Sequence, residues 1–239
     1  MDWRTVLPEV YIISELCGQW GGSVERAERM ILKSKLAGAD AVKVQLYDTH
    51  RMPGENRDLW EYLSMTREQF LRLKQFSDNL NIDFFASAFH PDRFSWILEA
   101  GIQTNKIASM LVGHDFGLCQ EMINSGMNTY CSLGSWSSDS YPFKDKNVKY
   151  FHCVSKYPHS LDEALKLMPT SFDDTLVGYS DHTDGIDACK EAILRGATVI
   201  EKHFTIDKSL QSKTEGAHSC SMTMEELSEL RLFCERRPK

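Results

Sequence analysis

Residues 175–205 read TLVGYSDHTDGIDACKEAILRGATVIEKHFT and show one full cycle of a pattern that runs along this chain. Two runs rich in β-branched and aromatic residues, TLVGYSD (175–181) and TVIEKHFT (198–205), have the composition of buried strands. Between them, DGIDACKEAILRGA (184–197) carries apolar residues at helical spacing and reaches a helix-stopping glycine, Gly196. A strand, a helix and a second strand in this order predict two parallel strands joined by a crossover helix.

The same alternation extends to both sides of this segment. Strand-like runs start about 27 residues apart, a spacing that suits one strand plus one helix. They lie at residues 10–16, 40–47, 82–89, 104–109, 128–134, 148–155, 175–181 and 198–205. Amphipathic helical patterns lie between or after them, at residues 23–38, 66–81, 90–101, 115–126, 159–168, 184–197 and 223–237. Such units in a chain of 239 residues predict an α/β fold, a (β/α)8 TIM barrel, as a single domain over residues 1–239.

Two segments depart from the alternation. Residues 48–65 form a long polar stretch with aromatic residues, and residues 135–147 (SWSSDSYPFKDKN) are too rich in serine, aspartate and proline for a helix. We expect loops at both places, the second in place of the fifth barrel helix. Both follow the carboxyl ends of predicted strands, where a TIM barrel carries its active site. An open dinucleotide-binding sheet is disfavoured, because no Gly-x-Gly-x-x-Gly follows the first strand.

The composition excludes several classes of function. The chain has 27 basic and 34 acidic side chains and a formal net charge of −7, which argues against a nucleic-acid or anionic-membrane surface. No apolar run approaches the roughly 18 residues of a membrane span. The first residues, MDWRTVLPEV, lack a signal-peptide pattern. Seven cysteines without a Cys-x-x-Cys pair are typical of reduced thiols, so we expect a cytoplasmic protein.

Side chains alternate along a strand, so residues two apart share a face. If these faces point inward, parity gathers the following residues at the carboxyl-terminal mouth of the barrel: Glu15, Lys43, Ser180, His182, Glu201 and His203. Neutral imidazole is the commonest metal ligand in proteins, and two histidines at the ends of adjacent strands suit a divalent cation. Two buried histidines bonded to the backbone or to Asp181 are the alternative, and the sequence leaves both open.

Lysines and hydroxyl groups occur at the same ends of the strands. Lys43 and Lys106 lie on the second and fourth strands. Serines lie at the ends of the third to seventh strands, at Ser87, Ser109, Ser132, Ser155 and Ser180. Ammonium groups ringed by hydroxyl groups form a cradle for phosphate or carboxylate. A salt bridge from Lys43 to Glu15 is the structural alternative, and Schiff-base chemistry is another use for a buried lysine.

These motifs together resemble the N-acetylneuraminate (sialic acid) synthase family. The resemblance rests on VGYSDHT (177–183) and IEKHFT (200–205). Shorter matches accompany them, namely SEL (14–16), AGADAVKVQ (37–45), NKIAS (105–109), SLG (132–134) and HCVSKYP (152–158). The matches run in order over nearly the whole chain.

The resemblance implies a TIM-barrel enzyme that condenses phosphoenolpyruvate with an N-acylated amino-sugar aldehyde, similar to N-acetylmannosamine, and releases phosphate. It implies that His182 and His203 hold a divalent metal, above all Mn²⁺, with Mg²⁺ or Co²⁺ as alternatives. It implies proton transfer or substrate orientation for Glu15. The residues that it implies for phosphoenolpyruvate are Lys43, Ser87, Lys106, Ser109, Ser132, Ser155, Tyr157 and Ser180.

Four features depart from the family pattern. Gln19-Trp20 stands in place of an Asn-His pair, Leu111 in place of an acidic residue, and the segment 217–221 lacks its aspartate. In the family a C-terminal antifreeze-like domain reaches the sugar pocket from the partner subunit, and we expect this barrel to lack it. We therefore expect an altered sugar site, and either a homodimer or a separately encoded lid-domain partner.

Two other functions stay open on the sequence. A condensation of phosphoenolpyruvate with a sugar phosphate, of the deoxy-octulosonate or deoxy-heptulosonate type, needs basic residues for a second phosphate. Arg51, Arg57 and Lys144 are the candidates in the loops of the mouth. A non-catalytic barrel that binds a ligand or holds a partner enzyme is the alternative from a different class.

Overall fold

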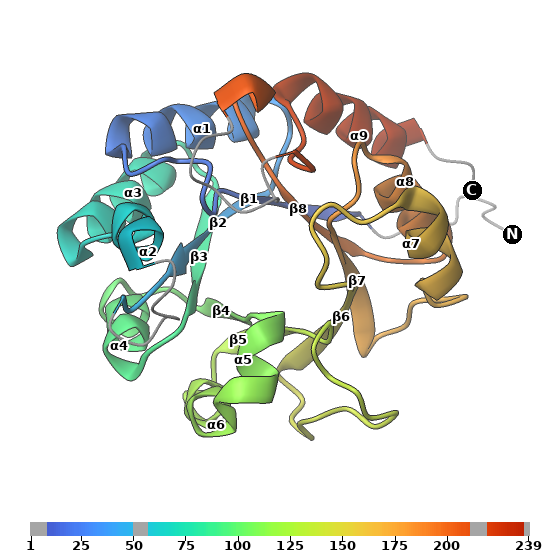
Figure 1. The fold of residues 1–239 in the computed structure, drawn as a ribbon, viewed down its shortest axis with the longest axis horizontal. Coiled ribbons are helices and arrows are strands. Elements are labelled where there is room, and N and C mark those ends of the chain that lie inside the picture. Colours follow the sequence, from blue (N-terminus) through green and yellow to red (C-terminus); the bar gives the residue numbers. More distant parts are fainter. Residues whose placement is uncertain (1–8, 50–56, 211–218, 237–239) are drawn as a thin grey trace, which may run out of the picture.

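Eight parallel strands alternate with helices and form a nearly closed (β/α)8 barrel (Figure 1). The structure is a computed structural model that describes residues 9–49, 57–210 and 219–236. Its strands are β1 (Tyr11–Glu15), β2 (Ala41–Leu46), β3 (Asp83–Ala88), β4 (Thr104–Ile107), β5 (Asn128–Ser132), β6 (Val148–Cys153), β7 (Leu176–Asp181) and β8 (Val199–His203). The predicted fold class is confirmed, and every strand lies within the run that predicts it.

The strands follow one another around the barrel in chain order. β1 pairs with β2 on one side and with β8 on the other, and the sheet continues from β8 through β7, β6 and β5 to β4. β3 and β4 lie side by side, although the described strands show no register between them (Figure 1). The register places Glu15 opposite Lys43 on β2 and opposite His203 on β8. Three polar side chains from neighbouring strands therefore reach the same level of the barrel.

Helices surround the strands (Figure 1). They are α1 (Val24–Leu36), α2 (Arg57–Leu63), α3 (Arg67–Asn79), α4 (Pro91–Glu99), α5 (Ser109–His114), α6 (Phe116–Asn124), α7 (Leu161–Leu167), α8 (Asp187–Leu194) and α9 (Met224–Arg236), with a 3-10 turn at Lys208–Leu210. Ser23 caps α1, and Thr66 with Gln69 forms the capping box of α3, as the sequence predicts. Within the described ranges no helix has the length and apolarity that crossing a membrane requires.

Two short helices correct the sequence analysis. α2 lies inside residues 48–65, which were expected to form a loop throughout. α5 begins at Ser109, a residue expected at the end of the fourth strand, and β4 stops at Ile107. α2 is stabilised because Trp60 is buried against the ring of Tyr47, with 5.0 Å between ring centroids. That partner follows β2, so the local sequence of α2 does not show it.

The segment between β5 and β6 contains no helix in the described structure, as expected. Its aromatic side chains cover the barrel instead, and Tyr141 stacks on Tyr150 of β6 with ring centroids 4.3 Å apart. Lys144 lines a cavity that also includes Thr175, just before the start of β7. The expectation that Lys144 lies at the mouth is therefore wrong, because this cavity is at the amino ends of the strands.

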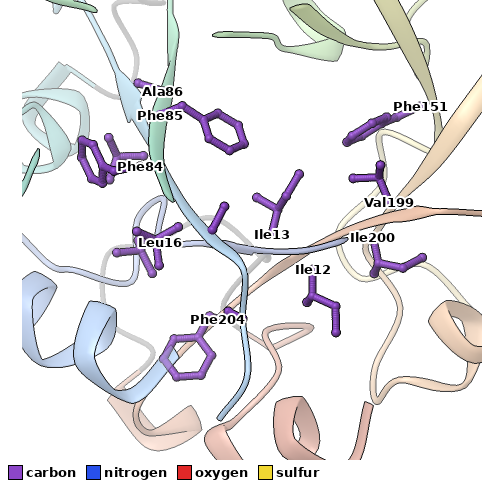
Figure 2. Packing of buried hydrophobic residues seen from close by; sticks show 14 of the residues in the cluster. Ile12, Ile13, Leu16, Phe84, Phe85, Ala86, Phe151, Val199, Ile200 and Phe204 are labelled. Atoms are coloured by element: carbon purple, nitrogen blue, oxygen red, sulfur yellow. The ribbon is translucent and has the colours of Figure 1, made fainter. Parts of the chain in front are cut away.

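The apolar core has two layers that follow the alternation of the strands. Ile13, Phe85 and Phe151 point into the barrel, whereas Ile12 and Phe204 point outward toward the helices (Figure 2). All five side chains are buried. The interior is a packed core below the mouth, so the polar residues at the carboxyl ends form a site on its top.

The last helix joins the amino-terminal end of the barrel. Arg231 of α9 donates from Nε to the carbonyl oxygen of Gly38 (2.7 Å) and from Nη1 to that of Val10 (3.2 Å). Its guanidinium also forms an ion pair with Asp40. The beginning and the end of the described chain are thereby held together.

Candidate active site

The predicted site residues gather at the carboxyl ends of the strands. A cavity of about 40 Å³ lies there, and we call it the deep cavity. Most of the predicted residues line it: Glu15, Lys43, Lys106, Ser109, Ser132, Tyr157, Ser180, His182 and His203. Ser87 adjoins the cavity, since its Oγ lies 3.4 Å from Lys43 Nζ. Ser155 adjoins it through Ser109, with 2.8 Å between the two Oγ atoms. The structure thus brings together the metal-binding, catalytic and phosphoenolpyruvate-binding residues that the resemblance implies.

Two lysines and two glutamates alternate on the floor of this cavity. Lys43 forms an ion pair with Glu15, and its Nζ lies 3.5 Å from Glu201 Oε2. Lys106 Nζ lies 3.5 Å from the other oxygen, Glu201 Oε1. None of the four residues is more than 5% exposed. Their formal charges cancel, so the salt bridge expected as the structural alternative is present within a neutral cluster.

Burial and pairing shift the pKa values of this cluster. Burial raises the pKa of Glu15, and Lys43 opposes this effect. Burial also acts to raise the pKa of Glu201, but the ammonium groups of Lys106 and Lys43 prevail and lower it to about 2. Burial lowers the pKa of Lys106, which Glu201 only partly offsets. Glu15 is therefore the carboxyl group of the cluster that binds a proton most readily.

Hydroxyl groups line one wall of the cavity. Lys106 Nζ donates to Ser132 Oγ at 2.6 Å. The Ser109 and Ser155 hydroxyl groups lie together beside Gly134. A Cβ atom at Gly134 would lie 2.6 Å from Ser155 Oγ and 2.8 Å from Ser109 Oγ. Only glycine leaves room for this pair. The sequence analysis gave Gly134 no role, although it ends the SLG motif.

The two histidines lie next to each other, with ring centroids 5.6 Å apart. Burial lowers the pKa of His182 to about 4 and that of His203 well below its usual value, so both rings are neutral. His182 Nδ1 lies 2.7 Å from the Val154 carbonyl oxygen, which can only accept, so Nδ1 donates and Nε2 keeps its lone pair. The Tyr157 ring packs against His182 at 4.2 Å between centroids.

The two imidazole rings can supply part of the ligand set of a divalent metal ion. His203 Nδ1 is buried and has no hydrogen-bond partner in the described part of the chain. That part contains no group of three histidine, cysteine, aspartate or glutamate residues that could hold a metal ion. A metal at His182 and His203 would therefore complete its coordination with water or substrate oxygens, as catalytic metals do. The backbone bond of His182 also matches the structural alternative, whereas Asp181 is engaged elsewhere.

Asp181 belongs to a second buried ion pair, on the outer side of the barrel. Lys202 Nζ lies 2.5 Å from Asp181 Oδ2 and 2.7 Å from the Thr183 carbonyl oxygen. Asp181 also accepts hydrogen bonds from the Thr183 N–H (3.0 Å), the Tyr179 hydroxyl (3.1 Å) and the Cys189 thiol (3.3 Å). This ion pair links the ends of β7 and β8, and each of its residues directly precedes one of the two histidines in the sequence. The sequence analysis missed it.

The residues that depart from the family pattern have become part of the core. Trp20 and Leu111 are 2% and 4% exposed and belong to the hydrophobic core. Gln19 is also buried, and both atoms of its amide lack a hydrogen-bond partner among the described residues. Arg51 and Ala217, which stands in place of the aspartate, lie outside the described residues.

A second cavity of about 340 Å³ adjoins the first, and we call it the outer chamber. It is lined by Gln45, Tyr47, Trp60, Phe89, Ala108, Ser109, Met110, Ser135, Ser155, Tyr157 and His203. Several of these residues also line the deep cavity, namely Gln45, Ala108, Ser109, Tyr157 and His203. A molecule in the outer chamber would therefore lie next to one in the deep cavity.

Comparison with known proteins gives the family. The NeuB family model matches residues 30–236, which is most of the chain. The chain belongs to the NeuB family. This NeuB family member is 28% identical, over 94% of its length, to the N-acetylneuraminate-9-phosphate synthase of Drosophila melanogaster, of which it covers 67%. It is 29% identical, over 92% of its length, to the N,N'-diacetyllegionaminic acid synthase of Legionella pneumophila, of which it covers 70%.

A solved structure supports the same relationship. The N-acetylneuraminic acid synthetase of Leptospira borgpetersenii, in complex with citrate, matches the NeuB family member with a TM-score of 0.84 and 32% identity. The match covers 95% of this chain and 83% of that one. The resemblance found in the sequence is confirmed, and the relatives are enzymes named as synthases of sialic acids and their analogues.

Proposed function

We propose that this protein condenses phosphoenolpyruvate with an N-acylated amino-sugar aldehyde, similar to N-acetylmannosamine, and forms a nonulosonic acid and phosphate. The observation that carries the proposal is the deep cavity, where the buried ammonium groups of Lys43 and Lys106 lie among serine hydroxyl groups beside two neutral histidines. The names of the relatives, which are synthases of acids of this class, support it.

Phosphoenolpyruvate carries two anionic groups, a phosphate and a carboxylate, and the cavity offers a cation for each. Lys106 with Ser132 forms one donor group, and Lys43 with Ser87 forms another. Hydrogen bonds from ammonium groups to phosphate or carboxylate are among the strong ones in proteins. In the free protein both lysines contact the carboxylates of Glu15 and Glu201. The anionic groups of the ligand therefore replace these carboxylates as partners of the ammonium groups.

The reaction forms one carbon–carbon bond and consumes one water. C3 of phosphoenolpyruvate attacks the aldehyde carbon, the aldehyde oxygen takes a proton and becomes a hydroxyl group, water adds at C2, and the bond from C2 to the phosphate oxygen breaks. Glu15 is placed to transfer or hold a proton, because burial raises its pKa and it lies on the cavity floor. The lysines neutralise the phosphate while it leaves.

A divalent metal ion, Mn²⁺ or in its place Mg²⁺ or Co²⁺, would bind to His182 and His203 and supply Lewis-acid polarisation of the aldehyde carbonyl. The hydrogen bond from His182 Nδ1 to the Val154 carbonyl oxygen holds that ring in one orientation. Asp181 and Lys202 hold the strand ends that carry both histidines.

The test is phosphate release from phosphoenolpyruvate with Mn²⁺ and each of a panel of N-acetylated hexosamines. We expect release that depends on the sugar and that is lost in His182→Ala and His203→Ala. His114→Ala, an exposed histidine on α5, is the matched control and keeps the activity.

Calorimetric binding of phosphoenolpyruvate separates the outcomes. Binding without release on any sugar would contradict the proposed reaction and favour the ligand-binding barrel. A lack of binding would contradict the assignment of Lys43 and Lys106.

A further inference from the structure

The carboxylate of Glu15 has two donors besides its ion pair with Lys43. The backbone N–H of Cys17 donates to Glu15 Oε1 at 2.8 Å. The side chain of Gln45 donates from Nε2 to Glu15 Oε2 at 3.4 Å. Both oxygens of the carboxylate therefore accept from a group that is not a lysine. Cys17 and Gln45, which supply these groups, are joined to each other through a further residue, Tyr47.

Tyr47 closes a ring of hydrogen bonds that begins and ends at Glu15. Its hydroxyl group donates to Gln45 Oε1 at 2.5 Å and lies 2.8 Å from Cys17 Sγ. The bond from Tyr47 to Gln45 is the shortest in the ring, and the bond from Gln45 to Glu15 is the longest. Tyr47 therefore fixes the orientation of the amide that meets the carboxylate.

Packing holds the hydroxyl group of Tyr47 in this place. Tyr47 is 3% exposed. Its ring centroid lies 5.0 Å from that of Trp60 and 5.1 Å from that of Phe89. Cys17 belongs to the same small hydrophobic cluster as Tyr47 and Trp60, together with Leu63 of α2. The aromatic contacts orient the ring of Tyr47, and the ring directs the hydroxyl group between the amide and the thiol.

The donors and acceptors of the ring can be assigned in order from Glu15. A carboxylate in an ion pair only accepts, so Gln45 turns Nε2 toward Glu15 and Oε1 toward Tyr47. Tyr47 has one hydroxyl proton, and it donates this proton to Gln45 Oε1. The thiol of Cys17 is then the donor in its contact with the Tyr47 oxygen. A side chain without a donor at position 17 would break the ring.

We infer that Tyr47 and Cys17 are positioning residues of the proposed condensation, which fix the carboxylate of Glu15 for proton transfer. The inference rests on the proposed function, in which Glu15 transfers or holds a proton. Cys17 is absent from the described residues that line the deep cavity or the outer chamber, so its thiol acts on the reaction through Tyr47 and Glu15. Proton transfer requires hydrogen-bond distance, so a small displacement of Glu15 lowers the rate.

The ring gains importance when phosphoenolpyruvate binds. In the free protein the ion pair with Lys43 also holds Glu15. Under the proposed function, an anionic group of phosphoenolpyruvate replaces Glu15 as the partner of Lys43. The Cys17 N–H and the Gln45 amide are then the groups of the ring that keep the carboxylate in place and satisfy its buried oxygens.

The first experiment compares Cys17→Ala with Cys17→Ser, which differ in one hydroxyl donor. The readout is kcat at saturating phosphoenolpyruvate and Mn²⁺, with the N-acetylated hexosamine that gives the fastest phosphate release. We expect kcat to fall about tenfold in Cys17→Ala, with the calorimetric affinity for phosphoenolpyruvate unchanged within about twofold. Cys17→Ser should regain most of the lost kcat, because its O–H replaces the thiol as donor.

Cys119→Ala is the matched control, because Cys119 is a buried cysteine on α6 outside the lining of both cavities. It should keep its kcat even where thermal unfolding shows the same loss of stability as in Cys17→Ala. Equal kcat in Cys17→Ala and Cys17→Ser would overturn the inference and leave the proposed function standing. A lack of phosphate release by the unsubstituted protein with every sugar would overturn the proposed function, and the inference with it.

The second experiment is a double-mutant cycle with Tyr47→Phe, which keeps the aromatic ring and removes the hydroxyl group. Tyr47 also lines the outer chamber, so the single variant alone does not isolate the ring of hydrogen bonds. We expect kcat to fall about tenfold in Tyr47→Phe. The double variant Tyr47→Phe/Cys17→Ala should be no slower than Tyr47→Phe, because the thiol acts through the hydroxyl group. Losses of kcat that multiply in the double variant would overturn the inference.

Discussion

Two buried clusters of lysines and carboxylates meet on β8, where consecutive residues face opposite sides of the strand. Glu201 faces into the barrel with Lys43 and Lys106, and Lys202 faces outward to Asp181. The outer cluster is saturated, since Lys202 contacts two oxygen atoms and Asp181 accepts from several further donors. The inner cluster is incomplete, since Glu201 Oε2 lacks a hydrogen bond among the described residues and its closest ammonium nitrogen lies 3.5 Å away.

We infer from the difference that buried charge serves structure in the outer cluster and, under the proposed function, ligand binding in the inner one. Removing one partner of a satisfied buried pair leaves a charge without compensation and destabilises the fold. In the incomplete cluster each ion pair contributes less to the stability of the fold. A ligand with its own anionic groups can supply the missing bonds. The same residue types therefore have different roles, and four measurements can separate them.

The largest effect is expected at the outer pair. Asp181→Ala leaves Lys202 buried and unpaired, so the free energy of unfolding should fall by about 3–5 kcal/mol. Denaturant unfolding followed by circular dichroism measures it. The double variant Asp181→Ala/Lys202→Met is the control and should regain a large part of the loss, because it removes the uncompensated charge. A loss below about 1 kcal/mol in the single variant would show that the saturated pair is not structural.

A substitution in the inner cluster should lower the affinity for phosphoenolpyruvate more than it lowers the free energy of unfolding. Lys106→Met removes a cation from the proposed phosphoenolpyruvate site, and we expect the affinity for phosphoenolpyruvate to fall about 100-fold, or about 2.7 kcal/mol. The unfolding free energy should change less than in Asp181→Ala, because Lys106 contacts Glu201 only at 3.5 Å. Calorimetry with phosphoenolpyruvate measures the first quantity, and Lys190→Met on the surface is the control. Unchanged affinity with a large loss of stability would reverse the comparison.

A smaller effect is expected beside the serine pair. Gly134→Ala places a Cβ atom 2.6 Å from Ser155 Oγ and 2.8 Å from Ser109 Oγ, so both hydroxyl groups must move. We expect about a tenfold loss of phosphoenolpyruvate affinity, or about 1.4 kcal/mol, with the fold intact. Gly117→Ala is the matched control, since a Cβ there meets only an ordinary contact at 3.5 Å. Equal affinities in the two variants would exclude the serine pair from the binding site.

The smallest effect is expected for a pair in solvent. Lys156 Nζ lies 3.0 Å from Glu163 Oε2, and the two side chains are 59% and 45% exposed. Solvent and salt screen such a pair, so Lys156→Ala should leave the unfolding midpoint unchanged within error. A clear shift of the midpoint would mean that burial is not what distinguishes the two buried clusters from this surface pair.

The sequence predicts the strands well because buried parallel strands are continuous apolar runs with glycines and polar residues at their ends. It also places Glu15, Lys43 and His203 on inward faces, because parity depends only on local alternation. It does not predict that Lys43 and Glu15 pair, since this follows from the register between β1 and β2. α2 was missed for a similar reason, because Trp60 is buried only against Tyr47 from a distant turn.

The role of Gly134 could not be predicted from the sequence. A glycine after a strand looks the same in the sequence whether it only ends the strand or also makes room for two serines. The position of Lys144 could not be predicted either. A loop that replaces a helix runs the length of the barrel, so the sequence cannot tell which of its residues lie at the mouth.

The contacts of Arg231 have a consequence for the order of synthesis. β1 is synthesised before β8, yet β8 is one of its two neighbours in the barrel. The carbonyl oxygens of Val10 and Gly38 likewise accept from the guanidinium of Arg231, which is synthesised later than both. A nascent chain that ends before residue 199 cannot form the β1–β8 ladder. Its half-formed barrel exposes strand edges until then, and such edges are prone to pair with other chains. Closure of the barrel in this protein therefore requires synthesis through β8.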